Sequence, residues 1–193
     1  MNPIPILLAS GSPYRKQLLR KIFDSFDVAV PDLDESPLPD ETPLQLSTRL
    51  AAEKAEALRP RFPTHWIIGS DQVAMRGETR LDKPETREQA GRQLAGSSGQ
   101  CVTFYTSICL ITPTGRKQIE TDLCKVYFRT LADDQIHRYF KREQPYDCAA
   151  SFKSEGLGIT LISRIEGNDP NALVGLPLIL LTKMMEQAGM EIP

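Results

Sequence analysis

Polar and charged side chains gather in one short stretch near the N-terminus, Ser10-Gly11-Ser12-Pro13-Tyr14-Arg15. This stretch follows an apolar run, Ile6 to Ala9, that is typical of a short strand buried on both faces. Ser12 is a favoured N-cap and Pro13 a favoured first helical residue, so we expect a helix to begin here. The free N–H groups of that helix, two hydroxyls and Arg15 outline a pocket for phosphate. The plainer alternative is a capped helix with Arg15 as a surface charge.

Further acidic and basic side chains follow predicted strands or lie on a helix or in loops. They are Asp34-Glu35 after the predicted strand 26–30, Lys54 on a predicted helix that begins at Thr42-Pro43, Asp71 after the predicted strand 66–69, and Lys83 and Lys153 in loops. Loops at one edge of an open α/β sheet are where such proteins bind ligands. Mg²⁺ prefers one or two carboxylates together with phosphate oxygens, which this set could offer. Solvated loop acids, surface lysines and a turn at Asp71 are the alternatives.

The elements that must position these residues predict an α/β protein. The first half of the chain alternates strands and helices, with a further helix at 85–95. In the second half we expect strands at 102–112 and 118–129 joined by a hairpin turn, a loop at 152–158 and a strand at 158–165. Helices are predicted at 133–143 and 178–188. We therefore expect one domain, residues 1–193, with a mixed central sheet, helices on its faces, and two lobes (about 1–100 and 101–193) flanking a cleft.

Composition excludes several classes of protein. The 193 residues carry 23 basic and 25 acidic side chains, and a net charge of −2 argues against a surface that binds nucleic acid polymers. The four cysteines are spaced too widely for a zinc knuckle, and the apolar run from Leu173 to Leu181 is about half the length of a membrane span. Met1-Asn2-Pro3 offers no charged region of a signal peptide, so we expect a reduced, cytoplasmic protein. P-loop, dinucleotide-loop, nucleophile-elbow and zinc-protease motifs are absent from the sequence.

Several short motifs occur in an order that is far more specific than any one of them. They are Ser10-Gly11-Ser12-Pro13-x-Arg15, Asp34-Glu35, Glu53-Lys54-Ala55, Gly69-Ser70-Asp71-Gln72, Lys83-Pro84, Ser98-Gly99, Phe128-Arg129, Phe152-Lys153-Ser154-Glu155-Gly156 and Val174-Gly175-Leu176-Pro177. In this order the sequence resembles the Maf family of nucleoside triphosphate pyrophosphatases, from about Leu7 to beyond Leu180. The resemblance implies a fold similar to that of Maf proteins and inosine triphosphatases.

The resemblance also implies a hydrolase that acts on acid anhydrides. It would split the bond between the α and β phosphates and so remove a modified nucleotide from the pool. Asp71-Gln72 and the Lys-Ser-Glu loop look like the branch that hydrolyses 7-methyl-GTP, whereas the dTTP/UTP branch carries Asp-Thr at the first position and Gln in place of Glu155. Tyr14 departs from the Trp expected in the 7-methyl-GTP branch.

By resemblance each candidate residue receives a role. The phosphate chain would be bound by Ser10, Ser12, Arg15 and Lys153, and Lys54 and Lys83 would be catalytic cations. Asp71 would be the proton acceptor, and Glu35 and Asp71 would be the metal ligands. The specificity residues would be Tyr14, Gln72 and Glu155. The expected cofactor is a divalent metal cation, Mg²⁺, Mn²⁺ or Co²⁺. The charges suit this reaction because a triphosphate repels an attacking oxygen unless cations offset its charge.

Three alternatives stay open at this point. The first is a dTTP/UTP pyrophosphatase of the same family. The second is a nucleotide-binding protein that acts in cell-division control without catalysis, and the third is a structural α/β protein. The expected partner is a nucleoside triphosphate rather than a nucleic acid polymer or a membrane, and the resemblance allows a homodimer.

Overall fold

The N-terminal apolar run forms strand β1 (Ile6–Ala9), and all four of its residues are buried. In this computed structural model, which describes residues 5–192, β1 pairs in parallel with β2 (Asp27–Ala29) and with β3 (Trp66–Arg76). The expectation that no leader precedes the chain rests on Met1-Asn2-Pro3, which lie outside the described residues.

The described strands form a single sheet of seven. Their order is β2-β1-β3-β5-β6-β7, and β4 (Thr79–Arg80) pairs with β3 off this path. Strands β5 (Cys101–Ile111) and β6 (Lys117–Phe128) are the predicted hairpin. Strand β7 (Ile162–Glu166) runs antiparallel to β6, so the sheet contains parallel and antiparallel pairs. The prediction of a mixed central sheet is confirmed.

The chain divides into two compact units, each assembled from separate segments. The first unit comprises residues 1–71, 106–122 and 169–193, and the second comprises residues 72–105 and 123–168. Strands β3, β5 and β6 contribute residues to both units.

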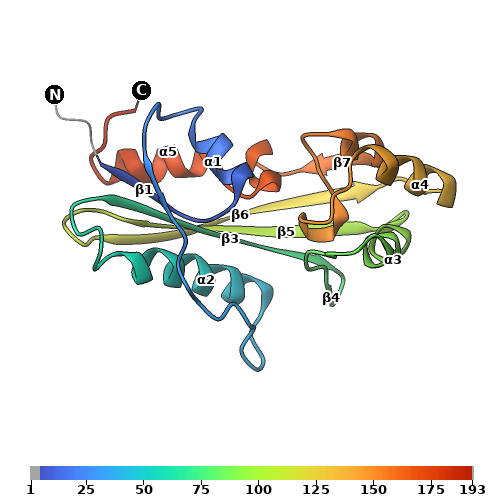
Figure 1. The fold of residues 1–193 in the computed structure, drawn as a ribbon, viewed down its shortest axis with the longest axis horizontal. Coiled ribbons are helices and arrows are strands. Elements are labelled where there is room, and N and C mark those ends of the chain that lie inside the picture. Colours follow the sequence, from blue (N-terminus) through green and yellow to red (C-terminus); the bar gives the residue numbers. More distant parts are fainter. Residues whose placement is uncertain (1–4, 193) are drawn as a thin grey trace. The chain divides into compact units, whose positions relative to one another are not determined.

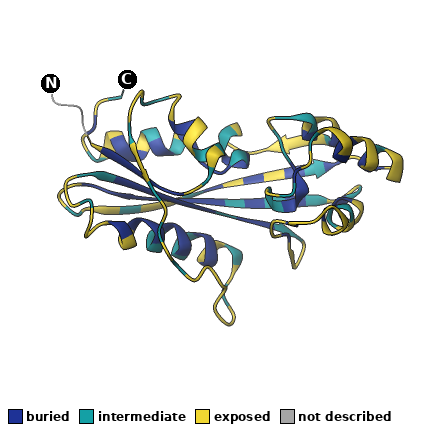
Figure 2. Cartoon of the chain, in the orientation of Figure 1, coloured by how far each residue is buried: buried dark blue, intermediate teal, exposed yellow. Residues whose placement is uncertain are grey.

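Helices cover both faces of the sheet in the first unit (Figure 1). Helices α1 (Pro13–Leu19) and α5 (Leu178–Gln187) lie on one face, and α2 (Pro43–Leu58) lies on the other. Ile6 and Leu8 of β1 belong to the core cluster shared with α1 and α5, whereas Leu7 and Ala9 belong to the cluster shared with α2. Alternate residues of a strand point to opposite faces, so β1 must be apolar throughout. Figure 2 shows the resulting burial along the central strands.

The second unit holds a smaller set of elements. These are β4, β7, the helices α3 (Arg87–Ser97) and α4 (Asp133–Arg142), and the 3₁₀ helices η1 (Ala149–Ser151) and η2 (Leu157–Leu161). Phe152 packs edge-on against Phe128, with ring centroids 5.4 Å apart, and also lies near Phe104. These aromatic contacts fix the start of the loop that carries Lys153 and Glu155.

Two local predictions are wrong. Strand β3 does not end at Ser70-Asp71-Gln72 but continues to Arg76, because Val73 and Ala74 are buried and extend the pairing. Residues 157–161 form η2 rather than the start of a strand. No helix within residues 5–192 is long and apolar enough to span a bilayer.

Candidate active site

Lys54 of α2 joins two acidic side chains in the first unit. Its Nζ donates to Asp71 Oδ1 at 2.7 Å and to Glu35 Oε2 at 2.9 Å. Lys54 and Asp71 are buried, with side chains only 7% and 9% exposed, whereas Glu35 is 55% exposed. A buried ion pair is retained only when its charges offset each other, so Lys54 is not the surface charge of the plainer alternative.

The close approach of α2 to β3 explains how Lys54 reaches Asp71. A Cβ on Gly69 would lie 2.2 Å from Ala51 O and 2.9 Å from Ala55 N, so only glycine fits at this point. Asp71 is two residues further along β3 and therefore faces the same side of the sheet as Gly69. The glycine thus allows α2 to bring its lysine within hydrogen-bonding distance of Asp71.

Arg15 adds a second cation to this group. Its Nε donates to Gly175 O at 2.8 Å and its Nη1 to Ser10 Oγ at 3.3 Å, and the guanidinium interacts electrostatically with Asp71 and Glu35. Burial lowers the pKa of the Arg15 guanidinium, and the negative charges of Asp71 and Glu35 oppose that shift. Arg15 is therefore a partly buried cation near the carboxylates of Asp71 and Glu35, and not a solvated surface charge.

The N-terminal hydroxyls have different functions. Ser12 caps α1, since its Oγ accepts from the backbone N of Arg15 at 3.3 Å. Ser10 is buried and accepts from Ser12 N as well as from Arg15. The capping alternative thus holds for Ser12, whereas Ser10 contacts the guanidinium directly. Tyr14 lies in the first turn of α1 and is partly buried.

The remaining candidates belong to the second unit, and their roles stay predictions. Gln72 follows Asp71 in β3, and Lys83 is exposed next to buried Pro84. Lys153 Nζ lies 3.5 Å from Glu143 Oε1, and Glu155 is exposed.

Glu143, at the end of α4, fixes the loop that carries Lys153 and Glu155. Its Oε2 accepts from Leu157 N at 2.6 Å. A Cβ on Gly156 would lie 2.5 Å from the same carboxylate oxygen, so another residue at this position would have to displace the Glu143 side chain.

Burial changes the acidity of the candidate proton acceptor. It raises the pKa of Asp71, and the nearby charges of Lys54 and Arg15 oppose this shift without cancelling it. A carboxylate whose pKa lies above its ordinary range is a better base while it remains ionised at neutral pH. This raised pKa agrees with the predicted role of Asp71 as proton acceptor, which stays a prediction.

Glu35 and Asp71 also fit two of the ligands of a divalent cation. Both carboxylates contact the same ammonium group, so they lie close to each other. Within residues 5–192, no group of three or more His, Cys, Asp or Glu side chains could hold a metal ion without other ligands. Mg²⁺ ordinarily takes several of its ligands from water and substrate phosphates.

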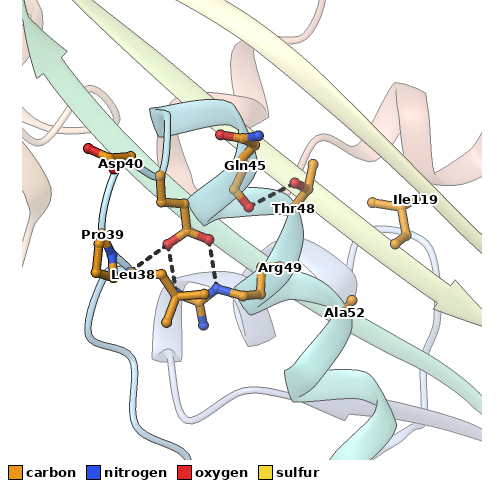
Figure 3. A pocket seen from close by; sticks show the side chains of 9 residues that line it. Leu38, Pro39, Asp40, Gln45, Thr48, Arg49, Ala52 and Ile119 are labelled. Atoms are coloured by element: carbon orange, nitrogen blue, oxygen red, sulfur yellow. Dashed lines mark hydrogen bonds and ion pairs between the residues drawn. The ribbon is translucent and has the colours of Figure 1, made fainter.

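A depression of about 470 Å³ lies elsewhere in the first unit (Figure 3). It is open to solvent and lies between residues 38–41, residues 45–52 of α2 and Ile119 of β6. None of the candidate site residues lines it, and its Glu41 and Arg49 are paired with each other. It is distinct from the Lys54 group.

Comparison with known proteins decides the family. The model of the family described as Maf-like protein matches residues 5–188. The chain belongs to the Maf family. Its curated relatives include the 7-methyl-GTP pyrophosphatase of Nitrosococcus oceani, 51% identical over 97% of this chain and 94% of the relative, and that of Alcanivorax borkumensis, 53% identical over 97% and 96%. Among solved structures, the Ham1 protein of Staphylococcus aureus shares the fold at a TM-score of 0.56 and 16% identity, covering 95% of this chain and 99% of that one.

The Maf chain contains two positioning residues that sequence reasoning missed. Gly175 O accepts from Arg15 Nε and also from buried Ser70 Oγ, at 2.8 and 2.9 Å. Gly175 has φ +105°, a left-handed conformation that side chains disfavour. Both residues lie in motifs used above to recognise the family, and Ser70 alternates with Asp71 along β3. Because neighbouring residues of a strand point to opposite faces of the sheet, this alternation indicates that Ser70 faces away from the side of Asp71.

We expect Gly175→Ala to damage catalysis through Arg15. The new Cβ would lie 3.2 Å from Arg15 Nε, and the positive φ adds strain of roughly 1–3 kcal/mol. Displacing a guanidinium that we predict to bind phosphate should lower kcat/KM about tenfold to a hundredfold. Steady-state kinetics and urea unfolding measure the two effects.

Gly189→Ala is the matched control for this prediction. Gly189 follows α5 at φ +95° and has no atom within 4 Å of an added Cβ, so it carries the strain without the contact. Equal kcat/KM in the two variants would contradict a role for Gly175 in placing Arg15.

Proposed function

We propose that this Maf protein hydrolyses 7-methyl-GTP to 7-methyl-GMP and diphosphate, and so removes a modified nucleotide from the pool. The observation that carries the proposal is Lys54, buried between Asp71 and Glu35 with Arg15 beside them. Relatives that are 50–53% identical over nearly the whole chain bear the name 7-methyl-GTP pyrophosphatase. Both the residues and the relatives support an anhydride hydrolase.

In the proposed reaction a water oxygen attacks the α phosphorus. A new P–O bond forms, the bond to the bridging oxygen of the β phosphate breaks, and diphosphate leaves with the bond's electron pair. Asp71 accepts the proton of the attacking water, and Lys54 fixes the orientation of its carboxylate. Arg15 and Ser10 bind phosphate oxygens and offset their charge.

We propose a divalent cation, Mg²⁺, Mn²⁺ or Co²⁺, as the cofactor, with Glu35 and Asp71 as its protein ligands. When bound, such a cation offsets negative charge on the phosphate oxygens. Lys83 and Lys153 of the second unit belong to the same proposal as further cations for the phosphate chain. The cytoplasm as compartment and a homodimer as assembly remain predictions.

A nucleotide panel tests the proposed function. Diphosphate release is measured with 7-methyl-GTP, GTP, dTTP and UTP, each with Mg²⁺, Mn²⁺ or Co²⁺ and with the metal chelated. The expected result is the highest kcat/KM with 7-methyl-GTP and loss of turnover on chelation. Preference for dTTP or UTP would support the other branch of the family. Binding without turnover of any nucleotide would support a non-catalytic protein.

We expect Glu155→Gln to reduce the preference for the methylated base. N7-methylation makes guanine positively charged, and a carboxylate attracts that charge whereas an amide does not. Glu155 is exposed, so we expect kcat/KM for 7-methyl-GTP to fall only about twofold to fivefold, with little change for GTP. The ratio of the two kcat/KM values measures the effect.

Glu78→Gln is the control for the specificity prediction, because Glu78 is an exposed carboxylate of the same unit outside the candidate set. If the ratio is the same in wild type and in Glu155→Gln, then Glu155 does not read the base.

A further inference from the structure

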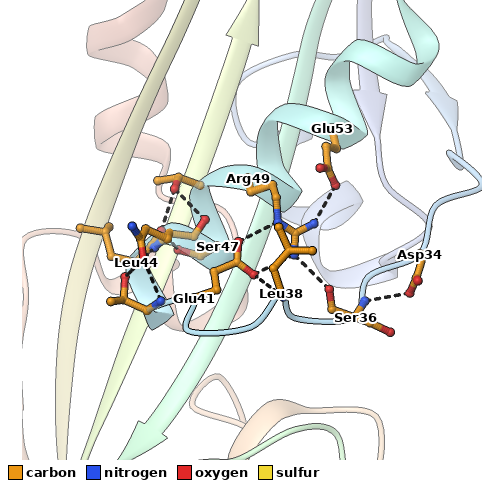
Figure 4. Close-up of polar contacts among 11 residues, drawn as sticks. Asp34, Ser36, Leu38, Glu41, Leu44, Ser47, Arg49 and Glu53 are labelled. Carbon is orange, nitrogen blue, oxygen red and sulfur yellow. Dashed lines mark hydrogen bonds and ion pairs between the residues drawn. The ribbon is translucent and has the colours of Figure 1, made fainter.

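The segment that carries Glu35, residues 31–42 between β2 and α2, is fastened to α2 by Arg49 (Figure 4). The guanidinium of Arg49 donates two hydrogen bonds to the carboxylate of Glu41, from Nε to Oε1 at 2.7 Å and from Nη2 to Oε2 at 2.8 Å. Nη2 also donates to Ser36 O at 3.0 Å, and Nη1 donates to Glu53 Oε2 at 3.0 Å. One side chain of α2 thus joins two points of the segment.

Glu41 in turn forms a hydrogen bond with the backbone of the segment. Its Oε2 accepts from Leu38 N at 3.0 Å, and its side chain is only 7% exposed although residues 34–40 are exposed. The hydrogen bonds from Arg49 lower the pKa of Glu41 to about 2, so the pair stays charged at neutral pH. A bidentate pair between Arg and a carboxylate fixes geometry as well as charge.

The position of Arg49 along α2 connects this pair to the candidate active site. Ser36 is the next residue after Glu35, and Arg49 lies five residues before Lys54 on the same helix. Two side chains of α2 therefore hold two consecutive residues of the segment, Arg49 at the Ser36 carbonyl and Lys54 at the Glu35 carboxylate. Fixing the Ser36 carbonyl also restricts where the Glu35 backbone can lie, because only the φ and ψ rotations of Ser36 separate that carbonyl from the planar peptide that joins the two residues.

We propose that Arg49 and Glu41 are positioning residues that hold the Glu35 segment on α2, so that Glu35 is in place for the divalent cation before it binds. The inference rests on the proposed function for the role of Glu35 as a metal ligand. Without the hydrogen bonds of Arg49 and Glu41, the segment would have to become ordered when the cation binds. The conformational entropy lost in that step would weaken the apparent affinity for the cation. Neither Arg49 nor Glu41 touches substrate in this scheme.

The first arm of the test measures backbone hydrogen exchange in the cation-free protein. Arg49→Lys keeps the positive charge but cannot donate two parallel hydrogen bonds to Glu41. In this variant, peptides covering residues 31–42 should exchange about tenfold faster, and peptides of α5 should exchange at the wild-type rate. Glu41→Gln should act in the same direction. The control is Lys117→Met, which removes a cation paired with Glu56 of α2 at 2.6 Å, away from the segment.

The second arm measures the Mn²⁺ concentration that gives half-maximal activity. For Arg49→Lys we expect it to rise about tenfold while kcat at saturating Mn²⁺ stays within about twofold, because the cation can still order the segment. Lys117→Met should match wild type. A variant that is merely less stable would show a lower melting temperature with an unchanged Mn²⁺ requirement.

The two arms separate failure of this inference from failure of the proposed function. Wild-type exchange at residues 31–42 in Arg49→Lys would overturn the inference, and so would faster exchange with an unchanged Mn²⁺ requirement. If wild-type protein hydrolyses no nucleotide, the proposed function fails, and the exchange arm alone decides whether Arg49 and Glu41 hold the segment.

Discussion

Asp71→Asn is expected to reduce kcat by about 10²–10⁴-fold while substrate binding is retained. Asparagine has the shape of aspartate, and its carbonyl oxygen can still accept from Lys54 at the position of Oδ1. What it lacks is the basic oxygen that takes a proton from water. Single-turnover hydrolysis of 7-methyl-GTP and equilibrium binding of the same nucleotide measure the two quantities separately.

Asp24→Asn is the control for Asp71→Asn, because Asp24 is an exposed aspartate of the same unit outside the candidate set. It should hydrolyse the substrate at the wild-type rate. An Asp71→Asn variant with wild-type kcat would remove Asp71 as the proton acceptor, even if the nucleotide panel supports the reaction.

The sequence was sufficient to predict the elements around the first candidate stretch. The buried strand Ile6–Ala9, the cap at Ser12 and the helix start at Pro13 all follow from local chemistry, and the structure confirms each of them. Such features depend on backbone hydrogen bonds and on residue preferences within one turn. The start of α2 at Pro43 was predictable for the same reason.

The burial of Lys54 was not predictable from its surroundings in the sequence. A lysine on a helix is ordinarily exposed, and here it is buried because Gly69 of another element lets α2 approach β3. The same limit applies to β3, whose pairing continues through Ser70 and Asp71 although such residues often end strands. The contact of Gly175 with Arg15 joins residues 160 positions apart, which no local pattern encodes.

The second large effect is expected for Lys54→Met, through the acidity of Asp71. Among the charges that oppose the rise in the pKa of Asp71, Lys54 is the largest. Its removal should raise that pKa further, because a nearby opposite charge favours the ionised carboxylate. The acid limb of the pH profile of kcat/KM should therefore move to higher pH. In Lys54→Arg, which keeps the charge, we expect the limb to stay near its wild-type position.

Stability should change with pH in the same variant. A carboxyl whose pKa is higher in the folded than in the unfolded protein binds more protons when folded, so its stabilising effect is present at low pH. That effect is lost as pH rises through the folded pKa. Lys54→Met increases the difference between the pKa of Asp71 in the folded protein and in the unfolded protein. The free energy of unfolding of this variant should therefore fall further below the wild-type value at pH 8 than at pH 5. Urea unfolding at both pH values measures this difference. An unchanged acid limb together with a pH-independent loss of stability would mean that Lys54 supports α2 but does not tune Asp71.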